Sequence, residues 1–306
     1  MKRWVAGIAL ITVVVLSLAV ALWQGPNAGE RTSRAAGGEI ALLRVEGVME
    51  TGESSGGLLG GYAGSDDIVA QLDEVAEDPT LKAVVMRVNS PGGSLVAAWE
   101  ISEAIKRVQA AGKPVVVSMG ETAASAAYWI SAAADWIIAN PATQTGSIGV
   151  ILQVQNLAGI YEKLGYELET FKSGTYKDIG NPAREMTDDE RALLQELVDE
   201  AFADFVQAVA EGRGMDPEQV RAIADGRILT GRKALELGLV DELGDLKRSV
   251  EVAGELAGIE GEPSVREMNK GNSLFGALLG KALTEVVGRS PSGGLWALET
   301  KPAILQ

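Results

Sequence analysis

Short apolar runs alternate with amphipathic segments along residues 39–258 of the chain. A continuous apolar run bounded by turn residues is typical of a strand buried on both faces, whereas apolar residues recurring every three or four positions are typical of a helix. The runs predict strands at 39–49, 81–88, 114–119, 136–139, 147–154 and 166–172. The helical pattern begins near residues 65, 94, 123, 155 and 187. Because strands and helices alternate, we predict an α/β fold with a parallel sheet covered by helices.

Capping signals and breaks in the pattern set the limits of these elements. Ser65 is the predicted N-cap of the first helix. Thr187 and Glu190 have the spacing of a capping box, which predicts a long helix to about residue 211. Shorter helices follow to about residue 258. Residues 260–306 have a poorer pattern, with one apolar helix expected at 273–287.

The first apolar run of the chain differs in kind, because residues 5–22 contain no charge. Lys2 and Arg3 precede the run, and Trp4 and Trp23 flank it. About 20 apolar residues cross a bilayer, tryptophans favour its interfaces, and basic residues mark the cytoplasmic end. We therefore expect a single-pass protein of the cell membrane with a cytoplasmic N-terminus and an extracytoplasmic body.

A cleaved signal peptide is the competing interpretation, since Ala19-Val20-Ala21 resembles a cleavage site. The apolar run is longer than the usual signal core, which favours an uncleaved anchor, and both interpretations export the rest of the chain. The pattern divides the chain into a start and membrane anchor at 1–25, a linker at 26–38, a folded domain at 39–258 and a C-terminal extension at 259–306.

Two residue types are missing from the 306-residue chain: histidine and cysteine. Their absence excludes Ser-His-Asp triads, Cys-His dyads, disulfides and metal sites built on imidazole or thiolate. Proton transfer then falls to carboxylates, lysine, tyrosine or water. The formal net charge of −15 opposes binding to nucleic acid, so we expect no such partner.

Two stretches have the composition of a site that activates a hydroxyl or binds an oxyanion. NSPGGS (89–94) lies between a predicted strand and a predicted helix, where its glycines let backbone N–H groups face a ligand; a tight turn with Ser94 as N-cap is the alternative. ETAASAAYWISAAAD (121–135) places Ser125 in the first turn of a predicted helix, where the helix dipole stabilises an alkoxide. Small residues also allow tight helix packing, and that interpretation stays open.

A nucleophilic serine needs a base, and lysine leads the possible bases when histidine is absent. Lysine must lose its charge to accept a proton, which burial or neighbouring cations favour. Lys172 and Lys177 lie beside a glycine turn in FKSGTYKDIG, although most lysines are solvated surface residues. Ser147 lies between two glycines in TGSIGV, where its hydroxyl either holds an amine in place or belongs to a turn.

Five segments in order resemble the signal peptide peptidase A family. These membrane-anchored serine/lysine peptidases share the fold of the Clp protease proteolytic subunit and the crotonases. The segments are VNSPGGS, ETAASAAYWISAAAD, ANPATQTGSIGV, FKSGTYKDIGNPAREMT and GRILTGRKALELGLVDELG. They run in order across residues 40–250, which is most of the exported body, and the resemblance implies that 39–258 is a peptidase domain with the Clp protease/crotonase-like fold. The chain resembles the short, single-copy form of the family.

The same resemblance implies a role for each matching residue. The matches are Ser125 as nucleophile, Lys177 as general base, Ser147 as the hydroxyl that orients the lysine amine, and the backbone N–H groups of Gly92 and Ala126 as the oxyanion hole. Lys172 is left without a catalytic role. The family often has glycines where this chain has Ala126 and Ala127; alanine retains the N–H, so the departure concerns pocket shape rather than mechanism.

The function implied by the resemblance is a serine endopeptidase that degrades remnant signal peptides at the membrane, with no metal or cofactor. It also implies a homo-oligomer in which neighbouring subunits supply the serine and the lysine. A crotonase-like acyl-CoA enzyme shares the oxyanion-hole turn and is the alternative, which the outward topology opposes because coenzyme A is cytosolic. A non-catalytic membrane scaffold is a third hypothesis, which covalent labelling of Ser125 by a serine-reactive phosphonate would contradict.

Overall fold

The structure of the protein is a computed structural model that describes residues 39–55 and 61–268. The membrane-spanning segment predicted at 5–22, the linker at 26–38 and the apolar helix predicted at 273–287 lie outside these residues. Among the residues described, no helix has both the length and the apolar character needed to cross a bilayer.

A parallel sheet forms the centre of the molecule, with the strand order β10-β1-β4-β5-β6-β9. Its strands are β1 (Ile40–Glu46), β4 (Ala83–Ser90), β5 (Val115–Ala124), β6 (Trp136–Ala139), β9 (Glu242–Leu243) and β10 (Val265–Glu267). Off this path, β7 (Gln144–Gly146) pairs in parallel with β5 and antiparallel with β8 (Ile228–Thr230), and β2 (Val48–Glu50) pairs with β3 (Tyr62–Gly64). The edge strand β10 belongs to the segment that we assigned to the C-terminal extension. The predicted α/β class with a mostly parallel sheet is confirmed.

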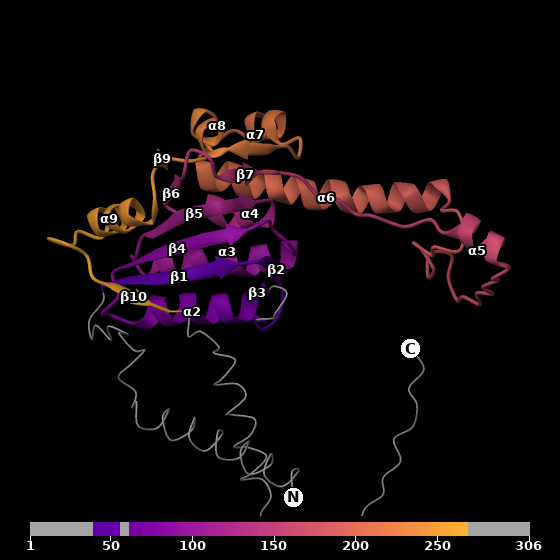
Figure 1. Cartoon of the computed structure of the whole chain (residues 1–306), viewed down its shortest axis with the longest axis horizontal. Coiled ribbons are helices and arrows are strands. Elements are labelled where there is room, and N and C mark those ends of the chain that lie inside the picture. Colours follow the sequence, from indigo (N-terminus) through magenta and orange to yellow (C-terminus); the bar gives the residue numbers. More distant parts are fainter. Residues whose placement is uncertain (1–38, 56–60, 269–306) are drawn as a thin grey trace, which may run out of the picture.

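Helices cover both faces of this sheet (Figure 1). They are α2 (Ser65–Glu77), α3 (Leu95–Ala110) and α4 (Ala126–Ala132) on one face, and α9 (Leu246–Leu256) on the other, while α7 (Pro217–Ile223) and α8 (Gly231–Glu236) lie near β8. In β1, Leu43 and Val45 face the first group, and Ile40 and Leu42 face α9. Because both faces are buried, the strands have continuous apolar runs in the sequence.

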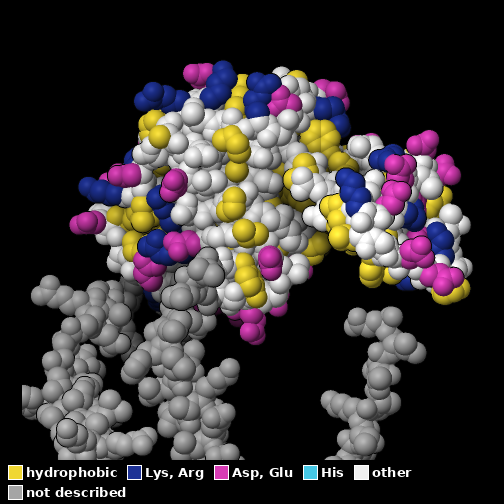
Figure 2. Space-filling model, turned by 45° about the vertical axis from the view of Figure 1, so that its right-hand side comes forward, with side chains coloured by type: hydrophobic (Ala, Val, Ile, Leu, Met, Phe, Trp, Pro, Cys, Tyr) yellow, Lys and Arg dark blue, Asp and Glu magenta, His cyan; other side chains and the backbone are white. Residues whose placement is uncertain are grey.

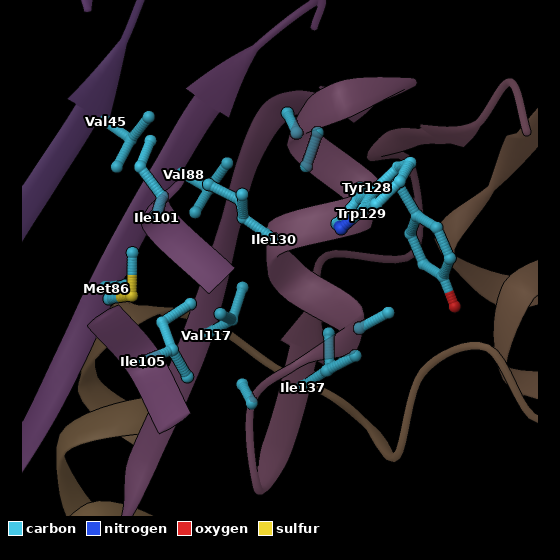
Figure 3. Close-up of a cluster of buried hydrophobic side chains, with 14 of the residues drawn as sticks. Val45, Met86, Val88, Ile101, Ile105, Val117, Tyr128, Trp129, Ile130 and Ile137 are labelled. Atoms are coloured by element: carbon cyan, nitrogen blue, oxygen red, sulfur yellow. The ribbon is translucent and has the colours of Figure 1, made fainter. Parts of the chain in front are cut away.

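The larger core lies between the sheet and helices α3 and α4, as Figure 3 shows. Strand and helix side chains that meet there are fully buried, and they include Val45, Val88, Val117, Ile101 and Ile130. Each such side chain contributes about 1.5–3 kcal/mol by leaving water. Tyr128 is also buried, and its hydroxyl donates a 2.9 Å hydrogen bond to the carbonyl oxygen of Leu239. Burial raises the pKa of Tyr128.

Helix α6 (Asp188–Arg213) joins this body to a projecting segment. In its C-terminal half, the rings of Phe205 and Trp129 lie 5.0 Å apart, and the missing side chain of Gly212 admits the carbonyl oxygen of Ala132. Its N-terminal half projects from the body together with helix α5 (Ala158–Leu164) and the loops around it (Figure 1). We call residues 151–197 the arm.

The arm has an unusual surface. Of the seventeen large apolar side chains that are exposed in the described chain, eleven lie in the arm, among them Ile151, Leu164 and Phe171. Figure 2 shows the arm as a separate lobe on which apolar side chains lie among charged ones. Large exposed apolar patches are typical of surfaces that bind proteins or membranes.

The strands predicted at 147–154 and 166–172 are wrong. Both segments belong to the arm or lead into it, and no strand of the described chain pairs with them. Ile148 is buried, but most other apolar side chains of the two segments are exposed, although the segments have the sequence pattern of strands. The helix predicted to begin near residue 155 begins at Ala158.

The predicted helix starts had mixed outcomes. Gly64, and not Ser65, is the N-cap of α2, because the Ser65 hydroxyl donates a 2.5 Å hydrogen bond to the carboxylate of Glu100 instead. The capping box of Thr187 and Glu190 is confirmed at the start of α6.

Candidate active site

Ser125 occupies a sharp turn between a strand and a helix. Strand β5 continues to Ala124, so α4 begins at Ala126 and not near residue 123 as predicted. Ser125 is the N-cap residue with φ 54°, a backbone angle that non-glycine residues rarely adopt. Such strain persists only where the surrounding structure enforces it, and it is concentrated at functional sites.

Pairing of β5 with β7 brings Ser147 beside Ser125. The register aligns Ala124 with Gly146, so the next residue of each strand is one of the two serines. The Ser125 N–H donates to the carbonyl oxygen of Gly146 at 2.9 Å, and the Thr145 hydroxyl donates to the β5 backbone at 2.7 Å. Ser147 also has a positive φ, of 51°. Both hydroxyls therefore leave the sheet at the same point.

One pocket of about 380 Å³ contains both serines. Its other walls come from the segment after Ser147, from α6 and from the loop before β8, through Gly149, Val150, Ile151, Val198, Asp199, Phe202, Ala224, Asp225 and Gly226. A larger cavity of about 750 Å³ lies between α3, α4 and α6. We place the site at the smaller pocket because the larger one does not include the strained serine. Within the described chain, no cluster of acidic side chains could hold a metal ion.

The turn after β4 lies directly against the nucleophile candidate. Gly92 has φ 108°, and a Cβ atom added there would lie 2.7 Å from Ser125 Cβ and 3.0 Å from the Ala126 nitrogen. Only glycine fits this contact. The Gly92 N–H, however, donates to the buried Ser90 hydroxyl at 3.1 Å, so the assignment of Gly92 as an oxyanion donor stays a prediction. The N–H of Gly93 has no acceptor among the residues described.

The first residue of α4 supplies a second backbone donor. The N–H of Ala126 has no intrahelical acceptor, because it begins the helix. The alanine side chains around Ser125 belong to the core. Ala123, Ala126 and Ala127 are fully buried and pack in the core, so their side chains do not meet a substrate. Tight packing, the alternative left open by the sequence, accounts for them.

The two lysines lie on the arm, away from this pocket. Lys177 is exposed on a turn and is not among the residues that line the Ser125 pocket. Lys172 is committed to an ion pair, since its Nζ donates to Asp178 at 2.7 Å and to the Thr175 carbonyl at 3.0 Å. Arg184 and Lys172 together hold the pKa of Asp178 well below its ordinary value. One chain therefore brings Ser125 and Ser147 together, but does not bring Lys177 to them.

Sequence reasoning missed several residues that shape these elements. The Ser90 hydroxyl accepts a hydrogen bond from the Gly92 N–H. On the arm, Arg184 donates hydrogen bonds to both Asp178 and Glu190. The signal for the arm network was present in the sequence, as opposite charges at a spacing of six residues on either side of Arg184. In the sequence, nothing distinguishes Ser90 from a serine that only forms part of a turn.

Comparison with known proteins identifies related families. Residues 107–260 match peptidase family S49, and residues 62–145 match Clp protease. Both matched segments include Ser125, and the first extends over Ser147 and the arm.

Individual relatives agree with these matches. The chain is 36% identical over 267 residues to "Putative signal peptide peptidase SppA" of Enterococcus faecium, which covers 79% of this chain and 77% of that protein. It is 36% identical over 246 residues to "Protease 4" of Salmonella typhi, covering 78% of this chain and 39% of that protein. It is 32% identical over 222 residues to "Serine protease SPPA, chloroplastic" of Arabidopsis thaliana, covering 72% and 33%. The chain thus spans less than half of the two longer relatives.

Proposed function

Because the chain belongs to peptidase family S49 and is a serine peptidase, we propose that it is a membrane-anchored endopeptidase that uses Ser125 and Lys177 as a catalytic dyad. The observation that carries this proposal is the strained turn at Ser125, which shares a pocket with the Ser147 hydroxyl and abuts the Gly92 turn. An α/β fold with a strand–turn–helix nucleophile suits acyl transfer, because free N–H groups at the helix start stabilise negative charge.

In the proposed mechanism, the neutral amine of Lys177 takes the proton from the Ser125 hydroxyl as its oxygen attacks the peptide carbonyl carbon. The carbonyl oxygen becomes an oxyanion, which backbone N–H groups of Ala126 and of the Gly92–Gly93 turn stabilise. The protonated lysine then gives its proton to the leaving amine as the C–N bond breaks. Water, deprotonated by the same lysine, hydrolyses the acyl-enzyme. Ser147 holds the amine in position.

The base comes from a neighbouring copy of the chain in this proposal. Lys177 is exposed at the surface of the arm, and Ser125 lines a pocket in the body that excludes it. The concentration of exposed apolar side chains on the arm supports the same arrangement, because contact with a second copy would bury them. A head-to-tail contact of this kind closes into a ring when its rotation closes.

The membrane and the substrate complete the proposal. The uncharged run at 5–22, preceded by Lys2 and Arg3, supports an anchor that leaves the body outside the cytoplasm. An anchored peptidase meets apolar peptides in or near the bilayer, and remnant signal peptides are such substrates. Cleavage uses no metal or cofactor in this mechanism.

The test uses the full chain and two inactive variants. Ser125→Ala and Lys177→Ala chains should each fail to cleave an apolar fluorogenic peptide. Co-expressed with different affinity tags and purified through both, they should form mixed oligomers. With random equal mixing, about one quarter of the interfaces join an intact Ser125 to an intact Lys177, so about a quarter of the parental activity should return. Mixed oligomers without activity would place each dyad within one chain, and full activity of Ser125→Ala would remove Ser125 from the mechanism.

A further inference from the structure

Arg184 holds the turn that carries Lys177. Its guanidinium donates to both carboxylate oxygens of Asp178, the residue that follows Lys177, each at 3.0 Å. It also donates to the Asp178 carbonyl oxygen at 3.2 Å. The side chain and the backbone next to Lys177 are therefore bound to one rigid, planar group.

The same guanidinium joins this turn to the start of α6. It donates to both oxygens of Glu190 at 2.6 and 2.8 Å, and to the Glu185 carbonyl oxygen at 3.0 Å. Glu190 in turn accepts the N–H of Thr187, so it belongs to the capping box of the helix. Because α6 runs from the arm into the core at Phe205, the guanidinium ties the Lys177 turn to a rigid element of the body.

The burial of this network separates it from an ordinary surface ion pair. The side chain of Glu190 is 3% exposed and that of Asp178 is 12% exposed, on an arm whose apolar residues are largely exposed. Desolvating such charges costs free energy that an apolar cluster of similar volume would not require. Such a buried network fixes the geometry of the Lys177 turn, in addition to any stability that it contributes.

Lys172 secures the turn from its other side. Its ammonium group binds the Thr175 carbonyl oxygen at 3.0 Å and the Asp178 carboxylate at 2.7 Å. The two bonded groups lie on either side of Lys177 in the sequence, so the turn is closed around it. The backbone agrees, since the Lys177 N–H donates to the Gly174 carbonyl oxygen at 3.2 Å.

We propose that Arg184 is a positioning residue for Lys177: it fixes the turn that presents the amine to the Ser125 pocket of the neighbouring copy. The inference rests on the proposed function, in which Lys177 is the base. The physical reason is that a proton acceptor must lie within hydrogen-bond distance of the serine hydroxyl. An amine on an exposed turn keeps such a position only if the backbone of the turn is fixed.

The test compares Arg184→Met with a matched variant, Arg107→Met, in the full-length chain. Arg107 makes a paired contact with Asp73 at 2.8 and 3.1 Å on a surface away from the arm and the pocket. We expect Arg184→Met to lower kcat about 100-fold, the effect of displacing a catalytic group by about 1 Å, with KM near the parental value. Arg107→Met should leave both constants unchanged. Added guanidinium ion, at concentrations well below denaturing ones, should restore part of the kcat of an Arg184→Ala variant but not that of Lys177→Ala.

The outcomes separate this inference from the proposed function. If Lys177→Ala keeps its activity, the proposed dyad fails. If Lys177→Ala is inactive but Arg184→Met has the parental kcat, only the positioning role is overturned. Size-exclusion chromatography and circular dichroism accompany each variant. Loss of assembly or helix content in Arg184→Met, together with no guanidinium rescue of Arg184→Ala, would assign Arg184 to folding of the arm and also overturn the proposal.

Discussion

Replacing Gly92 by alanine tests whether the turn after β4 sets the position of the nucleophile. The new Cβ atom would lie 2.7 Å from Ser125 Cβ, 2.9 Å from the Ala124 carbonyl oxygen and 3.0 Å from the Ala126 nitrogen. Ordinary van der Waals contact begins at 3.4 Å, so the turn and Ser125 must separate by at least 0.7 Å. A displacement near 1 Å costs about 100-fold in rate, and overpacking costs about 1–3 kcal/mol of stability.

The assay measures kcat/KM on an apolar peptide and the free energy of unfolding in urea for each variant. Gly112→Ala is the matched control, because Gly112 also has a positive φ, of 78°, but nothing lies within 4 Å of its added Cβ. We expect Gly112→Ala to lose about 1–2 kcal/mol of stability from backbone strain alone, with parental kcat/KM. Gly92→Ala should lose at least as much stability and about 100-fold in kcat/KM.

Parental kcat/KM in Gly92→Ala would refute the reasoning, since it would mean that Ser125 needs no close approach of this turn. An equal loss of activity in both variants would also refute it. In that case strain in the fold, rather than contact with the nucleophile, would control the rate.

Three further expectations follow from the site and the arm. Lys172→Ala should lower kcat by about fivefold or less, the value of one partly exposed ion pair, whereas Lys177→Ala should abolish cleavage; the reverse result would exchange their roles. Ser147→Ala should lower kcat by about tenfold, the value of one hydrogen bond, in the same peptide assay, and a complete loss would contradict an orienting role. Hydrogen bonds from Arg184 lower the pKa of Glu190 to about 2. The ion pair therefore stabilises the arm fully at pH values above the ordinary carboxylate pKa of about 4, and this stabilisation is lost as the pH falls through about 2. Hydrogen exchange of arm amides, corrected for intrinsic rates, should therefore show equal protection at pH 5 and pH 7, and a loss of protection at pH 5 would contradict this.

Much of the fold followed from local patterns in the sequence. Strands buried on both faces, such as β4 and β5, have continuous apolar runs that need no knowledge of their neighbours. The capping box of Thr187 and Glu190 is read from two residues three positions apart, and it forms as predicted. The absence of histidine and cysteine restricts the possible chemistry through composition alone, whatever the fold.

The predicted strands that failed had the right pattern but lacked a partner. Residues 147–154 and 166–172 have the apolar content of strands, yet a strand forms only where another strand accepts its hydrogen bonds. No such neighbour exists for them in the described chain, and most of their apolar side chains from Ile151 onward remain exposed on the arm. The apolar pattern of a segment does not show whether a neighbouring strand is available to pair with it.

The sequence by itself determined which residue types are available: a serine among alanines, a glycine turn, two lysines and a second serine between glycines. The tertiary structure decided which of them meet. The register of β5 on β7 sets Ser125 beside Ser147, and the Ser90 hydroxyl takes the N–H of Gly92. Lys177 lies on the arm and is not among the residues that line the pocket of the two serines. These relations depend on strand register and on competition for donors between residues far apart in the chain, and neither is encoded in local spacing.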